Sequence, residues 1–441
     1  MTRLPDDRLE TKLPDKAPLY TRPEAITEAN RCIYCVDAPC VQACPTGIDI
    51  PTFIHKIATD NVKGSARTIF AANLLGTSCA RVCPVEVLCA GSCVYNHWGR
   101  EPIAIGRLQR YATENAIAQD AELLSKTRKP ATGKTIACIG GGPASLAAAG
   151  HLALDGHTVH VYEKRAVAGG LNTTGVAPYK LHSEASLAEV ELILALGDIE
   201  LKTGVEIVDG EAGEGQVLVA KLAADYDAVF IGIGLGPDNA LGVEGEEGEG
   251  SVGAVEYIER LKLESGMGLD GIGTALVVGG GNTAIDIARE LAQLGVPDVA
   301  MVYRKTEAAM SGYHHEMVDA RKDGVRLVEN RQPTGVVREG GKVTGLKVKA
   351  TDTGAEETLA CDLVAMAIGQ SRLTKLAAAF GGVELDGKGR VQVDPATHRT
   401  GNPKVYAGGD CVNGGKEVVN AAQHGKLAAR AITASFGGEE N

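Results

Sequence analysis

The stretch Lys134-TIACIGGGPASLAAAGHLALDGHTVHVYEK, which ends at Lys164, decides the fold of this chain. An apolar strand turns on glycines into an Ala/Leu-rich helix, and a second apolar strand follows, which is the pattern of a βαβ unit. Such a turn is a dinucleotide-binding fingerprint, because the cofactor's pyrophosphate can sit on the helix N-terminus. An acid that ends the second strand can hold a ribose hydroxyl. The binding candidates are Gly140, Gly142, Pro143, Ala144, Ser145 and the strand-end acid Glu163.

A second unit of the same kind, Ala275-LVVGGGNTAIDIARELAQLGVPDVAMVYRK, follows further along the chain. Its small residues complete a GxGxxA pattern, and the two polar residues after the turn can face a pyrophosphate. The second strand runs into two basic residues, with no acid in the usual ribose position. Positive charge there favours a 2′-phosphate and hence NADPH, with a solvated basic turn as the alternative. The candidates are Gly279, Gly281, Asn282, Thr283, Ala284, Arg304 and Lys305.

Near the C-terminus, Val405-YAGGDCVNGGKEVVNAAQHGK supplies another apolar strand, which ends in Gly408-Gly409-Asp410. Asp410 can bind a sugar alcohol such as the ribityl chain of a flavin, with an exposed loop aspartate as the alternative. A helix expected from about Glu417, with Val418 in its first turn, would point its positive end at a flavin, where reduction develops negative charge. These features predict a flavin site.

The composition is that of a globular protein of two or three domains, with 441 residues, 44% hydrophobic and 23% charged. A net charge of −12 gives no electrostatic case for binding nucleic acid or an anionic membrane surface. No apolar run approaches the roughly 20 residues needed to cross a bilayer, and the N-terminus lacks the apolar segment of a signal peptide. We therefore expect a cytoplasmic protein without membrane contact.

Eight of the eleven cysteines lie between Cys32 and Cys93, and a reducing cytoplasm disfavours disulfides. The first group reads Cys32-x2-Cys35-x4-Cys40-x3-Cys44-Pro45, and the second reads Cys79-x3-Cys83-Pro84 followed by Cys89 and Cys93. Runs of thiolates that end in Cys-Pro are typical of iron–sulfur clusters, whose last cysteine often reaches the other cluster. A structural zinc site or a disulfide knot is the alternative. Eight cysteines would, by simple arithmetic, hold two cubane clusters.

These patterns predict an α/β protein with an N-terminal α-helical, ferredoxin-like domain carrying two [4Fe-4S] clusters, followed by two Rossmann-like domains. A helix is expected to begin near Thr21, and residues 125–133 to form a linker. Two further apolar strands, at 227–236 and 361–370, bracket the second unit, so the first nucleotide domain should be discontinuous. The expected boundaries are 1–125 for the iron–sulfur domain, 134–236 and 361–441 for the FAD domain, and 237–360 for the inserted NAD(P)H domain.

The motifs together resemble the electron-input part of dihydropyrimidine dehydrogenase, in its separate-subunit bacterial form. The resemblance covers nearly the whole chain and rests on Cys32-IYCVDAPCVQACPTGIDI, Leu75-GTSCARVCPVEVLCAGSC and Pro102-IAIGRLQRYATE. The glutamate synthase small subunit shares the same three-part plan. The resemblance implies FAD at the first unit, beside Gly169-Gly170-Leu171, and NAD(P)H at the second, with NADH open beside NADPH.

The resemblance also implies that each cluster draws ligands from both cysteine groups. One cluster would use Cys32, Cys35, Cys40 and Cys93. The other would use Cys44, Cys83, Cys89 and the side-chain oxygen of Gln109. Cys79 would then be a spare thiol.

Members of this family complete the reaction with an FMN-bearing (β/α)8 barrel that reduces uracil or thymine, and such a barrel needs about 250 residues. The three expected domains use the whole chain, so we expect the pyrimidine site on a separate FMN/iron–sulfur partner subunit. Cofactors do the redox chemistry, so no side chain is expected to act as a catalytic acid or base. The expected function is oxidation of NAD(P)H via FAD, with electrons passing through two clusters to the partner.

Three alternatives stay open. The chain could be a glutamate synthase small subunit, although the Cys83–Cys93 block and Leu108-Gln109 are closer to the pyrimidine family. It could be a stand-alone ferredoxin reductase. A redox-sensing scaffold that binds nicotinamide is the non-enzymatic alternative, and two complete dinucleotide units with a flavin-type Asp410 loop argue against it.

Overall fold

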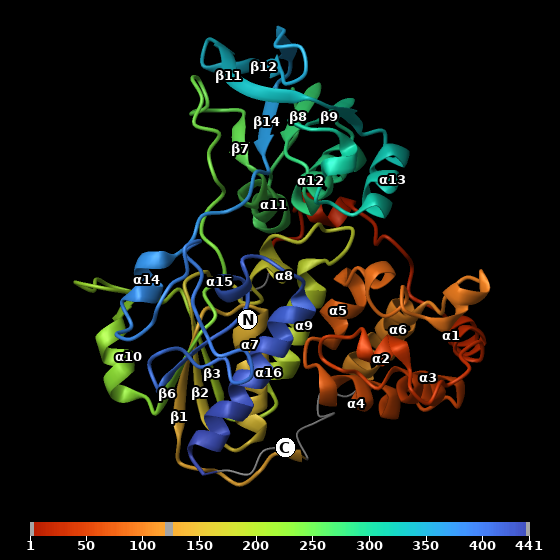
Figure 1. Cartoon of the computed structure of the whole chain (residues 1–441), viewed down its shortest axis with the longest axis vertical. Helices are drawn as coiled ribbons and strands as arrows, with labels where there is room; N and C mark the ends of the chain where they lie inside the picture. Colours follow the sequence, from red (N-terminus) through yellow and green to blue (C-terminus); the bar gives the residue numbers. More distant parts are fainter. Residues whose placement is uncertain (1–3, 120–126, 438–441) are drawn as a thin grey trace.

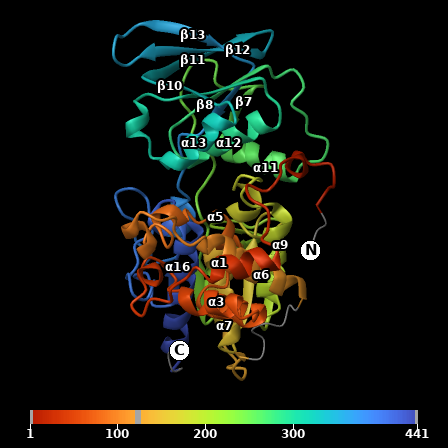
Figure 2. The same ribbon diagram turned by 90° about the vertical axis from the view of Figure 1, so that its right-hand side faces the viewer.

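The computed structural model describes residues 4–119 and 127–437, which fold into three parts coloured in sequence order in Figure 1. The helical N-terminal part lies beside one sheet domain, and the second sheet domain lies above both (Figures 1 and 2). The linker predicted at 125–133 falls in part outside the described residues. Among the described helices, none combines the length and the apolarity needed to cross a membrane.

The N-terminal part contains helices and no strand over residues 4–119. The helix predicted near Thr21 is confirmed: it has Pro23 in its first turn, and the Glu24 side chain accepts hydrogen bonds from the backbone and hydroxyl of Thr21. Apolar side chains such as Phe53 and Leu108 form a separate core for this part. Its helices are α1 (Arg22–Ala29), α2 (Pro39–Gln42), α3 (Ile50–Ala58), α4 (Val62–Ala72), α5 (Gly76–Val82) and α6 (Ile105–Gln119).

The first sheet is parallel, in the order β15-β6-β1-β2-β3, so the most C-terminal strand returns beside early ones. Its strands are β1 (Thr135–Ile139), β2 (Thr158–Glu163), β3 (Ile199–Thr203), β6 (Ala228–Ile231) and β15 (Val405–Ala407). Two long helices pack against each other over this sheet, α7 (Pro143–Leu154) and α16 (Val418–Ser435), the latter as predicted from Glu417. The remaining elements are α8 (Leu171–Thr174), α9 (Ser183–Leu194), β4 (Glu206–Val208), β5 (Gln216–Leu218), α10 (Val219–Asp225), α14 (Thr374–Ala378) and α15 (Asp410–Asn413).

The second sheet is also parallel, in the order β10-β9-β8-β14-β7. Its strands are β7 (Ser251–Gly253), β8 (Thr274–Val278), β9 (Asp298–Val302), β10 (Arg326–Val328) and β14 (Leu363–Met366). One face is covered by α11 (Ala254–Leu263), α12 (Asn282–Gln293) and α13 (His314–Lys322). The other face is covered by an antiparallel sheet of β11 (Arg331–Glu339), β12 (Lys342–Ala350) and β13 (Glu356–Ala360).

The chain crosses between the sheet domains twice, through two segments that lie side by side. Gly236 and Asn239 donate backbone hydrogen bonds to Ser371 and Gly369, and Ser371 donates to Pro237. The second crossing lies later than the boundary expected at residue 361. All four residues of β14 are buried, and the strand pairs with β7 and β8 of the second sheet, so the chain returns only after Met366.

The segment before α1 ties the three parts together. Leu9 packs into the core of the second sheet domain, and the Lys16 backbone donates to the carbonyl of Tyr179 in the first. Asp15 forms ion pairs with Arg81 and Arg110 of the helical part, at 2.7 and 2.5 Å. These contacts hold the three parts around a shared centre.

Candidate functional site

A cavity of about 1210 Å³ lies where the three parts meet. The first glycine turn contributes Gly140, Gly142 and Pro143 to its lining, the helical part contributes Cys83, and the second sheet domain contributes Asn282. One space is therefore shared by residues that are 57 (Cys83 to Gly140) to 199 (Cys83 to Asn282) positions apart in the sequence. A group bound at the first turn lies in the same cavity as a cysteine and a residue of the second unit.

The first glycine turn is shaped for a ligand that approaches its backbone. Gly140 has φ +86°, and a Cβ there would lie 2.6 Å from the carbonyl oxygen of Gly232. Glu163 is buried, and its carboxylate accepts hydrogen bonds from the backbone of Gly141 at 2.7 Å and of Arg165 at 2.8 Å. Ser145 does not line the cavity, since its hydroxyl donates to the carbonyl of Ile139 at 3.3 Å.

The flavin candidates from other parts of the sequence meet at the same cavity. Gly170, Leu171, Asp410 and Val418 all line it, as does Ala144. Burial raises the pKa of the Asp410 carboxyl, which accepts a hydrogen bond from the backbone of Lys416 at 3.2 Å. Asn172 also lines the cavity, and its buried Oδ1 has no partner among the described residues. A cradle without Cβ atoms and an unpaired buried amide fit a flavin dinucleotide.

The second glycine turn repeats the backbone geometry of the first, but its glycines do not line the large cavity. A Cβ on Gly279 would lie 2.4 Å from the carbonyl oxygen of Ala367, which matches the close approach at Gly140. Among this unit's candidates, Asn282 lines the cavity. Its side-chain oxygen accepts a hydrogen bond from the backbone of Tyr313 at 2.9 Å. The other candidates do not line it, namely Gly279, Gly281, Thr283, Ala284, Arg304 and Lys305, and the last two are exposed.

Four of the cysteines surround a small apolar cavity in the helical part. Cys32, Cys35, Cys40 and Cys93 line it together with Ile33, Ile54 and Ile103. Burial, followed by the charges of Cys32 and Cys93, raises the pKa of Cys40 to about 11. Thiolates so close to one another and to apolar walls repel, and iron ions at their centre would remove that repulsion.

A second group of cysteines, Cys44, Cys79, Cys83 and Cys89, lies close together, and Cys83 also lines the large cavity. Burial, followed by the charge of Cys44, raises the pKa of Cys89 to about 12. The pKa of Cys83 is well above its usual range, because Cys79 hydrogen bonds to it and because Cys79, Cys89 and Cys44 are close. Cys79 also accepts a hydrogen bond from Asn73 at 3.2 Å. The donor chemistry of both groups fits iron–sulfur clusters, which take thiolate ligands.

Gln109 lies on α6 and is 7% exposed. Its side-chain nitrogen donates to the carbonyl oxygen of Gly76, the first residue of α5, at 2.7 Å. This bond holds the amide at the helix that leads into Cys83 and orients it.

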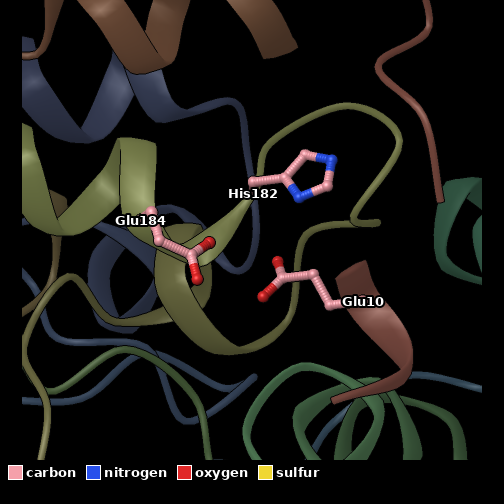
Figure 3. A group of neighbouring side chains, drawn as sticks. All are labelled: Glu10, His182 and Glu184. Atoms are coloured by element: carbon pink, nitrogen blue, oxygen red, sulfur yellow. The ribbon is translucent and has the colours of Figure 1, made fainter. Parts of the chain in front are cut away.

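Glu10, His182 and Glu184 lie close enough to hold a metal ion, as Figure 3 shows, and none of the sequence motifs includes them. The Arg8 guanidinium forms ion pairs with both glutamates. Lys262 adds a second buried cation, 3.4 Å from Glu10. Because these cations already balance the carboxylates, the group is an ion-pair cluster that is buried at Glu10 and exposed at Glu184.

Several residues of the large cavity carry no local sequence signal. Tyr313 donates to Glu417 at 2.8 Å across the two sheet domains, and burial, followed by Glu417, raises the pKa of Tyr313 to about 12. Lys180 forms an ion pair with Asp286 at 2.7 Å, also between the sheet domains. Each pair joins residues that are more than 100 positions apart, so only the packing of the domains reveals them.

Comparisons with known proteins agree with this division of the chain. A family model described as dihydropyrimidine dehydrogenase domain II, 4Fe-4S cluster, matches residues 10–121. A second model, described as pyridine nucleotide-disulphide oxidoreductase, matches residues 134–425. The predicted order of a helical 4Fe-4S domain followed by FAD/NAD(P)-type nucleotide-binding domains is confirmed.

Curated relatives match nearly end to end. The NAD-dependent dihydropyrimidine dehydrogenase subunit PreT of Escherichia coli K12 is 36% identical over 95% of this chain and 96% of its own length. The PreT subunit of Salmonella typhimurium LT2 is 34% identical over 95% and 96%. The glutamate synthase [NADPH] small chain of Escherichia coli K12 is 32% identical over 94% and 92%.

Solved structures share the fold of the two sheet domains. Thioredoxin reductase of T. acidophilum superimposes with a TM-score of 0.57 at 24% identity, over 68% of this chain and 98% of its own. FprA of Mycobacterium tuberculosis, in complex with NADPH, does so with a TM-score of 0.53 at 19% identity, over 70% and 85%.

Proposed function

The chain belongs to the dihydropyrimidine dehydrogenase subunit family of NAD(P)H-dependent flavin oxidoreductases, and we propose that it is the electron-input subunit of such an enzyme. It would oxidise NAD(P)H and deliver electrons singly to a partner subunit that carries FMN and reduces uracil or thymine to the 5,6-dihydropyrimidine. FAD and two [4Fe-4S] clusters, when bound, allow the two electrons taken from NAD(P)H to be passed on one at a time. The chain's own residues bind these groups in series and keep them apart from water.

The observation that carries the proposal is the single cavity that reaches Gly140, Cys83 and Asn282. A flavin on the first turn would have the nicotinamide unit on one side and a cluster ligand on the other. We assign FAD to residues 134–236 with 368–441, and NAD(P)H to the residues between. The binding residues proposed are those predicted from the sequence, with Asn172 added because it lines the cavity and its buried Oδ1 has no hydrogen-bond partner among the described residues.

We assign the cysteines to two clusters. The four cysteines that line the small cavity, Cys32, Cys35, Cys40 and Cys93, would hold the first. Cys44, Cys83, Cys89 and the Gln109 oxygen would hold the second, and Cys79 would remain a hydrogen-bonded thiol. The proximity of Cys44, Cys83 and Cys89 supports this division. Cys83 lines the large cavity, so the second cluster would be the one nearer the flavin.

The exposed pair Arg304 and Lys305 supports NADPH as a donor, since a 2′-phosphate needs cations at the end of β9. The PreT relatives are named as NAD-dependent, whereas the glutamate synthase relative is named for NADPH. A role as a glutamate synthase small chain remains the second candidate, supported by 32% identity over 94% of the chain.

The test is an anaerobic preparation analysed for flavin, iron and acid-labile sulfide. We expect about one FAD and two clusters per chain, NAD(P)H-dependent reduction of a one-electron dye, and no turnover of uracil until the FMN subunit is added. Uracil reduction by the chain alone would contradict the proposed division of labour. Electron delivery to a glutamate synthase large subunit, and not to the FMN subunit, would favour the second candidate.

A matched pair of variants tests the assignment of Cys83. Cys83→Ser should keep flavin reduction by NAD(P)H but lose at least about 100-fold in electron delivery to the partner, because one cluster lacks a ligand. Cys138→Ser replaces a fully buried cysteine of β1 that contacts no other cysteine group, and should leave iron content and delivery unchanged. Equal effects of the two substitutions would remove the support for the assignment.

A further inference from the structure

Lys426, on α16, is a buried cation that belongs to none of the proposed binding sites. Its side chain is 8% exposed, and its Nζ donates to the carbonyl oxygens of Thr46 at 3.2 Å and Ala72 at 2.9 Å. Both acceptors belong to the helical part, whereas α16 belongs to the first sheet domain. The side chain therefore carries a cation from the proposed flavin domain into the proposed cluster domain.

The surroundings of Lys426 place this cation next to a proposed cluster ligand. Thr46 lies two residues after Cys44, and its hydroxyl is 3.3 Å from the Cys44 sulfur. The pKa of Lys426 is lowered, first by burial and then by the nearby Arg430, and the charge of Cys44 opposes this shift. Ala72 is the last residue of α4, whose C-terminal carbonyls favour a positive charge. Two carbonyl acceptors and an anionic cluster would all favour the ammonium form.

The same helix reaches the large cavity. Glu417 and Val418, at the start of α16, line that cavity. The next residue, Val419, and Ala422, one turn further, share a hydrophobic core with Leu74 and Leu75 before α5. Helix α16 therefore runs from the proposed flavin site along the helical part to the loop that carries Cys44.

We propose that Lys426 is a positioning residue for electron transfer, whose ammonium raises the reduction potential of the cluster assigned to Cys44, Cys83, Cys89 and Gln109. This inference rests on the proposed function, because it needs that cluster. A buried positive charge stabilises the cluster state that carries one more electron. In the step concerned, one electron enters from the reduced flavin or a chemical reductant. No bond forms or breaks, and Lys426 keeps its proton.

The experiment compares Lys426→Gln, Lys426→Met and Lys426→Arg in the anaerobic full-length protein, by redox titration followed by electron paramagnetic resonance. The signal of the second cluster is identified by its loss in Cys44→Ser. Removing the charge should lower the equilibrium constant for one-electron reduction about tenfold, which is a midpoint about 59 mV more negative. The Arg variant should stay within about threefold of the parent, because it keeps the charge.

Lys404→Gln is the matched control, because the Lys404 amine also donates to a backbone carbonyl, that of Tyr226, within the first sheet domain. It should leave the midpoint unchanged. An unchanged midpoint in Lys426→Gln and Lys426→Met, with full iron content, would overturn the inference and reduce Lys426 to an interdomain hydrogen bond. If Lys426→Gln and Lys426→Met both lose the second cluster, the Arg variant decides the outcome. A second cluster that is retained in Lys426→Arg would support the role of the charge, and its loss in Lys426→Arg as well would overturn the inference. Absence of iron from the parent protein would instead refute the proposed function.

Discussion

The two βαβ units of this molecule share their backbone geometry and differ in their surroundings. In each, the first glycine of the turn, Gly140 or Gly279, lies close to a carbonyl at the end of a neighbouring strand. A Cβ on either glycine would lie 2.6 Å or less from that carbonyl oxygen. In each, the third glycine caps a helix of 12 residues. The first turn, however, faces a cavity built by all three parts, whereas most of the second turn's candidates lie outside it.

The difference extends along each unit. Helix α7 buries nine of its 12 residues, and β2 ends in the buried Glu163. Helix α12 has a buried face and a polar one, and β9 leads into the exposed Arg304 and Lys305. A turn that faces a cavity between three parts suits a cofactor that stays bound, and a turn outside that cavity suits a dinucleotide that enters and leaves with each turnover. The same local motif can therefore serve a resident or an exchanging ligand, depending on what covers it.

The largest effect should come from placing a methyl group at each turn. Gly140→Ala should weaken flavin binding about a hundredfold, because overpacking against the Gly232 carbonyl costs up to about 3 kcal/mol. Gly279→Ala should keep flavin and lose NAD(P)H-dependent dye reduction instead. Flavin absorbance of the purified proteins and steady-state kinetics measure the two outcomes.

Gly281→Ala is the control for folding alone, because Gly281 is itself one of the proposed nicotinamide-binding residues. Its φ is −100°, and the nearest atom to a new Cβ is the Ser311 hydroxyl at 3.5 Å, so the fold should accept the change. Loss of flavin in Gly279→Ala would show that the two turns are not separate sites and would break the comparison.

A second effect concerns the joint between the helical part and the first unit's domain. Glu189 of α9 is fully buried and accepts hydrogen bonds from the backbone of Thr77 at 2.6 Å and of Ser78 at 3.2 Å. Burial raises the pKa of Glu189 to about 7, although the bonds from Ser78 and Thr77 lower it. The unfolded chain then releases this proton at lower pH than the folded one, so stability falls as pH rises from about 4.5 to 7.

Glu189→Gln should remove this pH dependence, which amounts to about 3 kcal/mol of unfolding free energy. Anaerobic denaturant unfolding between pH 5 and 8 measures it. Glu191→Gln, at an exposed position of the same helix, should retain the slope of the parent. A parent-like slope in Glu189→Gln would show that the carboxyl is ionised in the folded protein throughout this range.

The smallest effect tests the open end of the second unit. Replacing Arg304 and Lys305 together by Ala should raise the KM for NADPH about tenfold and leave that for NADH within about twofold, since exposed charge contacts with a phosphate are worth about 1 kcal/mol. Lys342→Ala, an exposed lysine of β12, should change neither KM. Equal changes for both nicotinamides would mean that the basic pair is a solvated turn.

Much of this molecule could be predicted from local sequence. The two units, the capped helix at Thr21, the helix after Glu417 and the acid at the end of β2 follow from short-range patterns that the backbone must obey. The point at which the chain returns to the first domain could not be predicted, because a fully buried strand such as β14 has the same sequence pattern in either sheet. Its place depends on pairing with β7 and β8, which no local pattern encodes.

The sequence by itself determined the kinds of groups that this chain can bind, because glycine spacing and cysteine spacing act over a few residues of backbone. The tertiary structure decided which of them share a space. Cys83, Gly140 and Asn282 line one cavity, and Lys426 lies beside the Cys44 loop, only because separate domains pack together. Contacts between residues hundreds of positions apart depend on the burial of whole surfaces, which the local spacing of residues does not record.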